Sequence, residues 1–134
     1  MDTADARFGG IARLYGKDGL AKLGAAHVAV IGVGGVGSWS AEALARSGIG
    51  KLTLVDLDEV CITNTNRQIH ALEGSINKAK VNELALRIHR INPDCTVYAR
   101  TEFFTSQTAD SILSGGFDYL IDAIDGLTNK CLLL

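Results

Sequence analysis

The feature that most constrains the fold is a strand, a glycine-rich turn and a helix that follow one another without a break. Residues 27–31 (HVAVI) form a short, β-branched apolar run closed by glycine, which predicts a fully buried strand. The turn GVGGVG follows, and residues 38–47 (SWSAEALARS) then predict a helix that stops at Gly48. A second strand at 52–56 (LTLVD) completes a βαβ unit, which closes right-handed onto a parallel sheet.

The remainder of the chain continues the alternation of helices and strands. Val81, Leu84 and Ile88 fall on one face of a predicted helix that ends at Asn92-Pro93. The alternation predicts an α/β fold, a Rossmann-like doubly wound sheet with mainly parallel strands. The other expected elements are a helix at 16–23, a polar loop at 57–68, a helix at 78–90, a strand at 96–100, a helix at 106–113 and a strand at 118–123.

Length and composition are those of one globular domain. The chain has 134 residues, of which 47% are hydrophobic and 21% charged. Its formal net charge of −2 provides no overall basic field of the kind that attracts nucleic acid, although a local patch could do so. The three cysteines form no CxxC pair, which favours a reducing cytoplasm over a disulfide framework or a zinc site. We expect neither a secretory signal nor a membrane-spanning segment in this chain.

The four glycines of the turn, Gly32, Gly34, Gly35 and Gly37, predict a phosphate-binding loop. Glycine permits positive φ and close approach of the backbone to a ligand, and the helix amino terminus favours negative phosphate groups. Asp56 ends the second strand, where a carboxylate can accept hydrogen bonds from ribose hydroxyls. The alternative is a tight strand–helix turn that binds no ligand.

Polar residues after the second and fourth strands separate the two classes of nucleotide that such a turn can bind. Asp58, Asn64 and Arg67 follow strand two, Lys80 opens the next helix, and Asp125 follows strand four. The carboxyl edge of a parallel sheet, where ligands of open α/β sheets bind, brings these segments together. Two cations and a carboxylate can hold a triphosphate and its Mg²⁺, whereas a nicotinamide site needs no such array. The sequence therefore favours ATP over NAD; the alternative for the two cations is a solvated surface position.

The same motifs resemble the MoeB/ThiF/HesA superfamily, the bacterial relatives of ubiquitin-activating enzymes. The matching pattern spans residues 7–130 and consists of GVGGVG, an aspartate at a strand end, N-x-x-R-Q, a lysine opening a helix that closes in INP, and D-A-I-D. Within that superfamily, RFGGIARLYG, GGVGSW, EALARSGIG and VCITNTNRQIHAL look like the branch that dehydrates threonylcarbamoyladenosine in tRNA.

This resemblance implies an enzyme that uses ATP to adenylate a carboxylate. In the tRNA branch the carboxylate belongs to threonylcarbamoyladenosine beside the anticodon, and the activated group then cyclises with net loss of water. By motif matching, Gly34 and Gly35 would lie against the phosphates and Asp56 on the ribose. The match assigns the triphosphate to Asn64, Arg67 and Lys80, and Mg²⁺ to Asp125.

The resemblance also implies partners: tRNA as substrate, a second copy of the chain in a homodimer, and by family association a cysteine desulfurase with its sulfur acceptor. Members of the family reach across their dimer with an arginine, which Arg13 matches less securely; Arg7 is the other candidate. Asn77 stands where relatives often carry glycine, so the loop there could differ from theirs.

Two other functions remain open. An activating enzyme for a ubiquitin-like sulfur carrier would share the nucleotide site, but the wording TNTNRQIHAL, in place of SNLxRQ, favours tRNA. An NAD-binding Rossmann module is the third candidate. The final NKCLLL stops one turn into a predicted helix. We therefore expect residues 1–134 to be the ATP-binding adenylation domain of a longer protein, with the sheet incomplete at its carboxyl end and the substrate and dimer regions beyond it.

Overall fold

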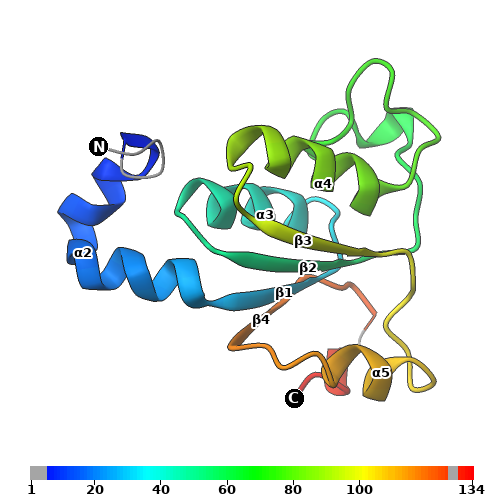
Figure 1. Ribbon diagram of the computed structural model, residues 1–134. Coiled ribbons are helices and arrows are strands. Elements are labelled where there is room, and N and C mark those ends of the chain that lie inside the picture. The colour runs from blue at the N-terminus through cyan, green and yellow to red at the C-terminus, as the bar shows by residue number, and fades with distance from the viewer. Residues whose placement is uncertain (1–5, 127–129) are drawn as a thin grey trace.

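A four-stranded parallel sheet forms the centre of the chain (Figure 1). The structure is a computed structural model and describes residues 6–126 and 130–134. The elements, in chain order, are α2 (Gly9–Ala25), β1 (His27–Ile31), α3 (Gly37–Arg46), β2 (Lys51–Val55), the 3₁₀ helix η1 (Ile62–Asn64), α4 (Lys80–Ile91), β3 (Thr96–Arg100), α5 (Ala109–Leu113) and β4 (Tyr119–Asp122).

The strand order across the sheet is β3-β2-β1-β4, which confirms the predicted α/β, Rossmann-like fold. β1 pairs in parallel with both β2 and β4, and β2 pairs in parallel with β3. The first three strands progress outward in one direction, and β4 then lies on the other side of β1. This reversal makes the carboxyl ends of β1 and β4 a topological switch point, where open α/β sheets bind their ligands.

Alternate residues of the central strands point to opposite faces of the sheet. In β1, Val28 and Val30 belong to the core cluster formed with α3 and α4, while Ala29 and Ile31 belong to a smaller cluster formed with α5. Figure 1 shows α3 and α4 on one face of the sheet and α5 on the other. Because β1 is buried on both faces from Val28 onward, its sequence is continuously apolar from Val28 to Ile31 rather than alternating.

Helix α4 has the amphipathic character that the sequence predicts. Val81, Leu84 and Ile88 are completely buried against the sheet and α3, and burial of each contributes about 1.5–3 kcal/mol. The helix begins at Lys80, two residues later than predicted. The preceding residues 77–79 pair instead with the loop after β2, where the Asn77 N–H donates to the Val60 carbonyl at 2.8 Å.

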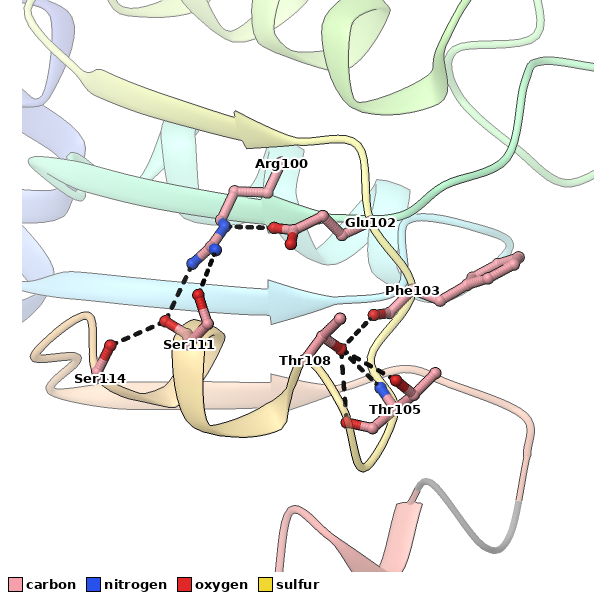
Figure 2. Close-up of polar contacts among 7 residues, drawn as sticks. All are labelled: Arg100, Glu102, Phe103, Thr105, Thr108, Ser111 and Ser114. Atoms are coloured by element: carbon pink, nitrogen blue, oxygen red, sulfur yellow. Dashed lines mark hydrogen bonds and ion pairs between the residues drawn. The ribbon is translucent and has the colours of Figure 1, made fainter.

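The structure departs from the sequence prediction at two other helices. Helix α2 begins at Gly9 rather than at residue 16, and it is kinked at Gly16, where φ is +79°. Helix α5 begins at Ala109 rather than at residue 106, because the Thr105 N–H donates to the Thr108 hydroxyl oxygen at 2.9 Å and forms a turn there instead (Figure 2). No helix in residues 6–126 and 130–134 is both long enough and apolar enough to cross a membrane.

Candidate functional site

A cavity of about 610 Å³ lies above the carboxyl edge of the sheet, at the switch point. Its walls come from the glycine turn, the segments after β2, β3 and β4, and the first residue of α4. The size suits a ligand such as a nucleotide. The predicted site residues that line it are Gly32, Gly34, Gly35, Asp56, Asp58, Asn64, Arg67, Lys80 and Asp125.

The glycines of the turn have different structural reasons to be glycine. Gly32 has φ +90°, and a Cβ there would lie 2.7 Å from the Ala123 carbonyl oxygen. A Cβ on Gly37 would overlap the carbonyl oxygen of Gly32, so this residue is required for close packing and does not line the cavity. Gly34 and Gly35 have room for a Cβ with respect to the protein, and both border the cavity. Their missing side chains leave open the space in which a ligand would lie.

Asp56 holds the glycine turn in place. Its Oδ2 accepts a hydrogen bond from the Val33 N–H at 2.9 Å, and its Oδ1 accepts one from the Asp58 N–H at 2.9 Å. Val33 is the residue between Gly32 and Gly34, so the carboxylate ties the end of β2 to the turn after β1. A carboxylate can accept about four hydrogen bonds, and Asp56 therefore keeps acceptor capacity on the cavity side.

His70 fixes the other side of the same residue, because its Nε2 lies 2.7 Å from the Val33 carbonyl oxygen. A carbonyl only accepts, so Nε2 carries the hydrogen and Nδ1 is the bare nitrogen. Nδ1 is buried, with no hydrogen-bond partner among the described residues. Burial is the main cause that lowers the pKa of His70 below its ordinary value of 6.5. His70 lies behind the turn and does not line the cavity.

Lys80 is a charged side chain that the fold removes almost completely from water. It is 6% exposed and lines the cavity. Its Nζ lies 4.0 Å from Oδ2 of Asp58, whose side chain is 59% exposed. The Lys80 N–H donates to the Asp58 carbonyl at 3.1 Å, in the short antiparallel pairing that closes the loop after β2. A buried ammonium with one distant, solvated partner favours binding of an anion in the cavity.

Arg67 reaches the cavity from the loop after η1. Its Nη1 donates to the Thr63 carbonyl at 3.1 Å and to Oδ1 of Asn66 at 2.9 Å. The indole N–H of Trp39 donates to the Arg67 carbonyl at 2.8 Å, so α3 helps to position the arginine backbone. The guanidinium has no carboxylate partner in the described part of the chain, and its remaining donors can serve an anion.

The two carboxylates of the D-A-I-D motif have different surroundings. Asp122 accepts a hydrogen bond from Lys130 Nζ at 2.7 Å, whereas Asp125 is exposed and lines the cavity. Asn64 also lines the cavity, but its Oδ1 is engaged locally by the Cys61 N–H at 2.8 Å. Within residues 6–126 and 130–134 no three or more His, Cys, Asp or Glu side chains are grouped to hold a metal ion by themselves.

The two arginines considered for reaching across a dimer lie away from this cavity. Arg13, on α2, lines a separate groove with Phe8 and Asn92, beside the amino ends of the strands. Arg7 donates through Nη1 to the Ile91 carbonyl at 2.6 Å. The chain therefore does not bring either arginine to its own candidate site.

Asn77 keeps the loop before α4 in a backbone conformation that suits glycine. Its φ is +69°, the one positive value for a residue other than glycine in residues 6–126 and 130–134. Asparagine tolerates the left-handed region better than most residues. The asparagine therefore does not force the loop away from a conformation that a glycine would adopt.

Sequence reasoning missed the wall of the cavity contributed by the segment after β3. Glu102, Phe103 and Phe104 line it there, and no motif pointed to them. The available signal was positional, since they follow a strand whose carboxyl end lies at the same sheet edge. The charged lining comprises four carboxylates and two cations, an excess of two negative charges; the residues are Asp56, Asp58, Glu102, Asp125, Arg67 and Lys80.

Comparison with known proteins agrees with this arrangement. The sequence pattern of the ThiF family matches residues 9–134. A tRNA threonylcarbamoyladenosine dehydratase of Haemophilus influenzae is 51% identical over 134 residues, which is 100% of this chain and 51% of the relative. At 33% identity over 119 residues, the adenylyltransferase and sulfurtransferase MOCS3 of Drosophila yakuba is more distant; the match covers 89% of this chain and 26% of that protein.

Solved structures show the same fold. The Escherichia coli tRNA N6-threonylcarbamoyladenosine dehydratase TcdA, in complex with ATP, superposes with a TM-score of 0.97 at 51% identity. The alignment covers 99% of this chain and 55% of that one. The chain thus spans about half the length of these dehydratases.

Proposed function

The chain belongs to the ThiF family, and from this premise we propose that it forms the ATP-binding adenylation domain of an enzyme that dehydrates threonylcarbamoyladenosine in tRNA. The observation that carries the proposal is Lys80, a buried cation that faces the cavity beside the glycine turn with only a distant, solvated counter-charge. The 51% identity to a dehydratase of that name over the whole chain supports the choice of substrate.

The proposed roles of the cavity residues follow from their positions. Gly34 and Gly35 leave the space for phosphate groups, and Lys80 and Arg67 supply the positive charge that binds them. Asn64, which lines the same cavity, would also contact the triphosphate. Asp56, which already accepts one hydrogen bond from the Val33 N–H of the turn and one from the Asp58 N–H of its own loop, would accept hydrogen bonds from the ribose with its remaining acceptor capacity.

Magnesium is proposed from the charges of the cavity. Arg100 pairs with Glu102 at 2.6 Å, which leaves one negative charge in excess around the cavity, and this charge would repel an ATP tetra-anion unless a divalent cation is bound with it. Mg²⁺ is commonly held by one or two carboxylates together with substrate phosphates, so the lack of a dedicated metal cluster in the described residues does not conflict with it. Asp125, exposed at the cavity and without an ion-pair partner in the described residues, fits that role, and Asp58 is the nearest alternative.

The chemistry proposed for the whole enzyme is a carboxylate activation. A carboxylate oxygen of threonylcarbamoyladenosine attacks the α-phosphorus of ATP, and the bond to pyrophosphate breaks. A nucleophile of the same modified group then attacks the activated carbonyl, and AMP leaves with the carboxylate oxygen. The net result is cyclisation with loss of water, driven by cleavage of ATP. Lys80 and Arg67 would stabilise the negative charge that develops on the phosphates.

We also propose a homodimer in which α2 contributes to the interface, together with the dimer regions expected beyond residue 134. No residue of this 17-residue helix is buried, and Leu14 and Tyr15 are 68% and 62% exposed. Leu23, near the end of α2, packs against the core, and a second copy would provide packing for the exposed side chains that precede it. Arg13, or Arg7 beside it, would then reach the partner's cavity. Sedimentation at micromolar concentration would test the dimer.

The main alternative is adenylation of a ubiquitin-like sulfur carrier, favoured by the match to MOCS3 at 33% identity. It would use the same ATP site, and a cysteine desulfurase with its acceptor would then be the partners. A cytoplasmic location is part of both proposals, because both reactions need cellular ATP. An NAD-binding module is disfavoured, since it would have no use for Lys80 and Arg67.

Nucleoside analysis of tRNA tests the proposal directly. Cells lacking the gene should accumulate the open form of threonylcarbamoyladenosine, which is heavier than the cyclic form by one water. Reintroducing the intact gene should restore the cyclic form, whereas the Lys80→Ala version should not. Persistence of the cyclic form in the deletion strain would exclude the tRNA reaction. Loss of sulfur-carrier adenylation in the same strain would support the alternative.

A further inference from the structure

The carbonyl of Val33, in the glycine turn, depends on one side chain for its hydrogen bond. It accepts this bond from Nε2 of His70 at 2.7 Å, and no backbone N–H of residues 6–126 and 130–134 donates to it. Val33 is fully buried and His70 is 2% exposed, so water does not replace this donor. His70 therefore determines on which side of the turn the carbonyl lies.

The same contact sets the direction of the next N–H group. The Val33 carbonyl and the Gly34 N–H belong to one planar trans peptide, in which the two bonds point to opposite sides. His70 lies behind the turn, whereas Gly34 lines the cavity. The Gly34 N–H therefore points to the cavity side, and it has no backbone acceptor in the described part of the chain. It is available to an anionic ligand.

Without His70 this peptide would reverse at little cost. A reversal changes mainly ψ of Val33 and φ of Gly34, and glycine adopts both signs of φ. The reversed carbonyl would reach water in the cavity, which relieves the penalty of an unpaired buried acceptor. Its oxygen would then lie where an anion binds and would repel that anion. A donor behind the turn is thus needed to keep an N–H, rather than a carbonyl, toward the ligand.

The following peptide is held by a different residue. The Gly34 carbonyl accepts hydrogen bonds from the N–H of Ser38 at 3.1 Å and from the Ser38 hydroxyl. Ser38 is fully buried on α3 and does not line the cavity. The helix that follows the turn thus supplies this second contact by itself, whereas the contact to Val33 comes from a loop residue 37 positions away in the sequence.

His70 adds little to stability through this contact. Nε2 gains one hydrogen bond, but Nδ1 is buried and has no partner among the described residues. An unpaired buried acceptor costs at least as much as a hydrogen bond between neutral groups contributes. An apolar side chain would remove the unpaired nitrogen and would leave the Val33 carbonyl free to reverse. The main consequence of the contact is therefore the direction of the Gly34 N–H.

We propose that His70 is a positioning residue of the phosphate site, which holds the Val33 carbonyl so that the Gly34 N–H donates to a phosphate oxygen. This role rests on the proposed function, because it takes the phosphates of ATP to lie at the glycine turn. His70 does not touch the ligand and acts through the backbone of Gly34. It affects the phosphate part of the nucleotide and not the nucleoside part.

Calorimetric titration of the 134-residue chain with Mg-ATP, Mg-tripolyphosphate and adenosine tests this role. Tripolyphosphate has only the phosphate part of the nucleotide, and adenosine has none of it. A hydrogen bond between neutral groups corresponds to about 2- to 12-fold in an equilibrium constant. His70→Leu should therefore weaken ATP and tripolyphosphate by one common factor in that range and leave adenosine unchanged. His70→Gln should recover most of the loss, because its amide N–H can take the place of the Nε2–H.

The amide signal of Gly34 provides a second measurement that does not depend on affinity. In ¹H–¹⁵N correlation spectra of the unmodified chain, the Gly34 amide proton should move downfield when tripolyphosphate binds, because it then donates to a charged oxygen. An amide proton that stays in place at saturation would overturn the role, since the N–H would not meet the phosphate.

His27→Leu is the matched control. Nε2 of His27 also makes one side-chain contact, 2.8 Å from the Thr53 hydroxyl oxygen, but at the amino end of β1 and away from the cavity. This variant should bind all three ligands normally, whatever stability it loses.

The outcomes separate the role of His70 from the ATP site itself. Normal tripolyphosphate binding by His70→Leu would overturn the positioning role and leave the ATP site standing. An equal loss of adenosine binding, or no recovery in His70→Gln, would also overturn it, because the ring would then act through the fold. Failure of the unmodified chain to bind either ATP or tripolyphosphate would refute the proposed function, and the positioning role with it.

Discussion

Replacing Lys80 with methionine should stabilise the free protein and weaken ATP binding. The substitution keeps an unbranched stem of similar length and removes the charge from a position that is 6% exposed. Asp58, its one ion-pair partner within residues 6–126 and 130–134, has a side chain that is 59% exposed and 4.0 Å away, so it remains solvated when the lysine charge is lost. The fold therefore keeps its packing and is relieved of a buried cation.

The two effects can be estimated separately. Replacing a buried ion pair by apolar groups is neutral to stabilising by about 1–4 kcal/mol; here only the lysine is replaced, and loss of its screened attraction to Asp58 offsets at most about 1 kcal/mol. A net gain of about 0–3 kcal/mol raises Tm by up to roughly 10 °C for a chain of this size. On the binding side, a hydrogen bond from a charged group contributes about 1.5–3 kcal/mol, so Kd for ATP should rise about 10- to 150-fold.

Scanning calorimetry of the free chain and titration with Mg-ATP measure these two quantities. Lys78→Met is the matched control, because Lys78 lies two residues earlier, with a 63% exposed side chain that pairs with Glu83 at 3.9 Å. That variant should change neither Tm nor Kd appreciably. A Lys80→Met protein that is less stable and binds ATP normally would show that the lysine supports the fold and would refute the reasoning.

Three further outcomes are expected. Because burial lowers the pKa of both His70 and His27, the unfolded chain takes up protons below pH 6.5 that the folded chain does not. Urea unfolding should show stability falling from pH 7 to pH 5, less steeply in His70→Asn, and a flat profile would contradict this. Burial raises the pKa of Cys95 to about 11, while the Thr63 hydroxyl lowers the pKa of the exposed Cys61. A thiol reagent at pH 8 should therefore modify Cys61 first and Cys95 only after denaturation, as peptide mapping would show. Gly37→Ala should destabilise the chain by about 3 kcal/mol or more in the same urea assay, because its Cβ would overlap a backbone carbonyl oxygen; a stable variant would show that the turn can rearrange.

The fold was predictable because its strands and helices carry strong periodic signals. The β-branched run at 27–31 predicts a buried strand, and the structure has β1 there. The spacing of Val81, Leu84 and Ile88 predicts the buried face of a helix, and these side chains are buried on α4. Helix ends were harder to predict, since they depend on side-chain and loop hydrogen bonds. The Thr105–Thr108 turn delays α5, and the pairing of residues 77–79 with the loop after β2 delays α4.

The cavity was predictable where a motif combined with the rule for parallel sheets. Arg67 and Lys80 are distant in sequence from the glycine turn, and the shared carboxyl edge brings all three to one cavity. Sequence could not reveal that Asp56 would accept hydrogen bonds from the Val33 N–H of the turn and from the Asp58 N–H, or that His70 would hold the Val33 carbonyl. It also gave no sign of Phe103, because a single aromatic residue after a strand has no pattern of its own.

The central claim is that the glycine turn and its cations hold ATP rather than a dinucleotide. Calorimetric titration of the 134-residue chain with Mg-ATP, and again in the presence of excess NAD, tests it most directly. We predict saturable ATP binding that NAD does not displace, and no heat of binding for NAD alone. Saturable NAD binding that competes with ATP, or tight NAD binding without ATP binding, would contradict the account.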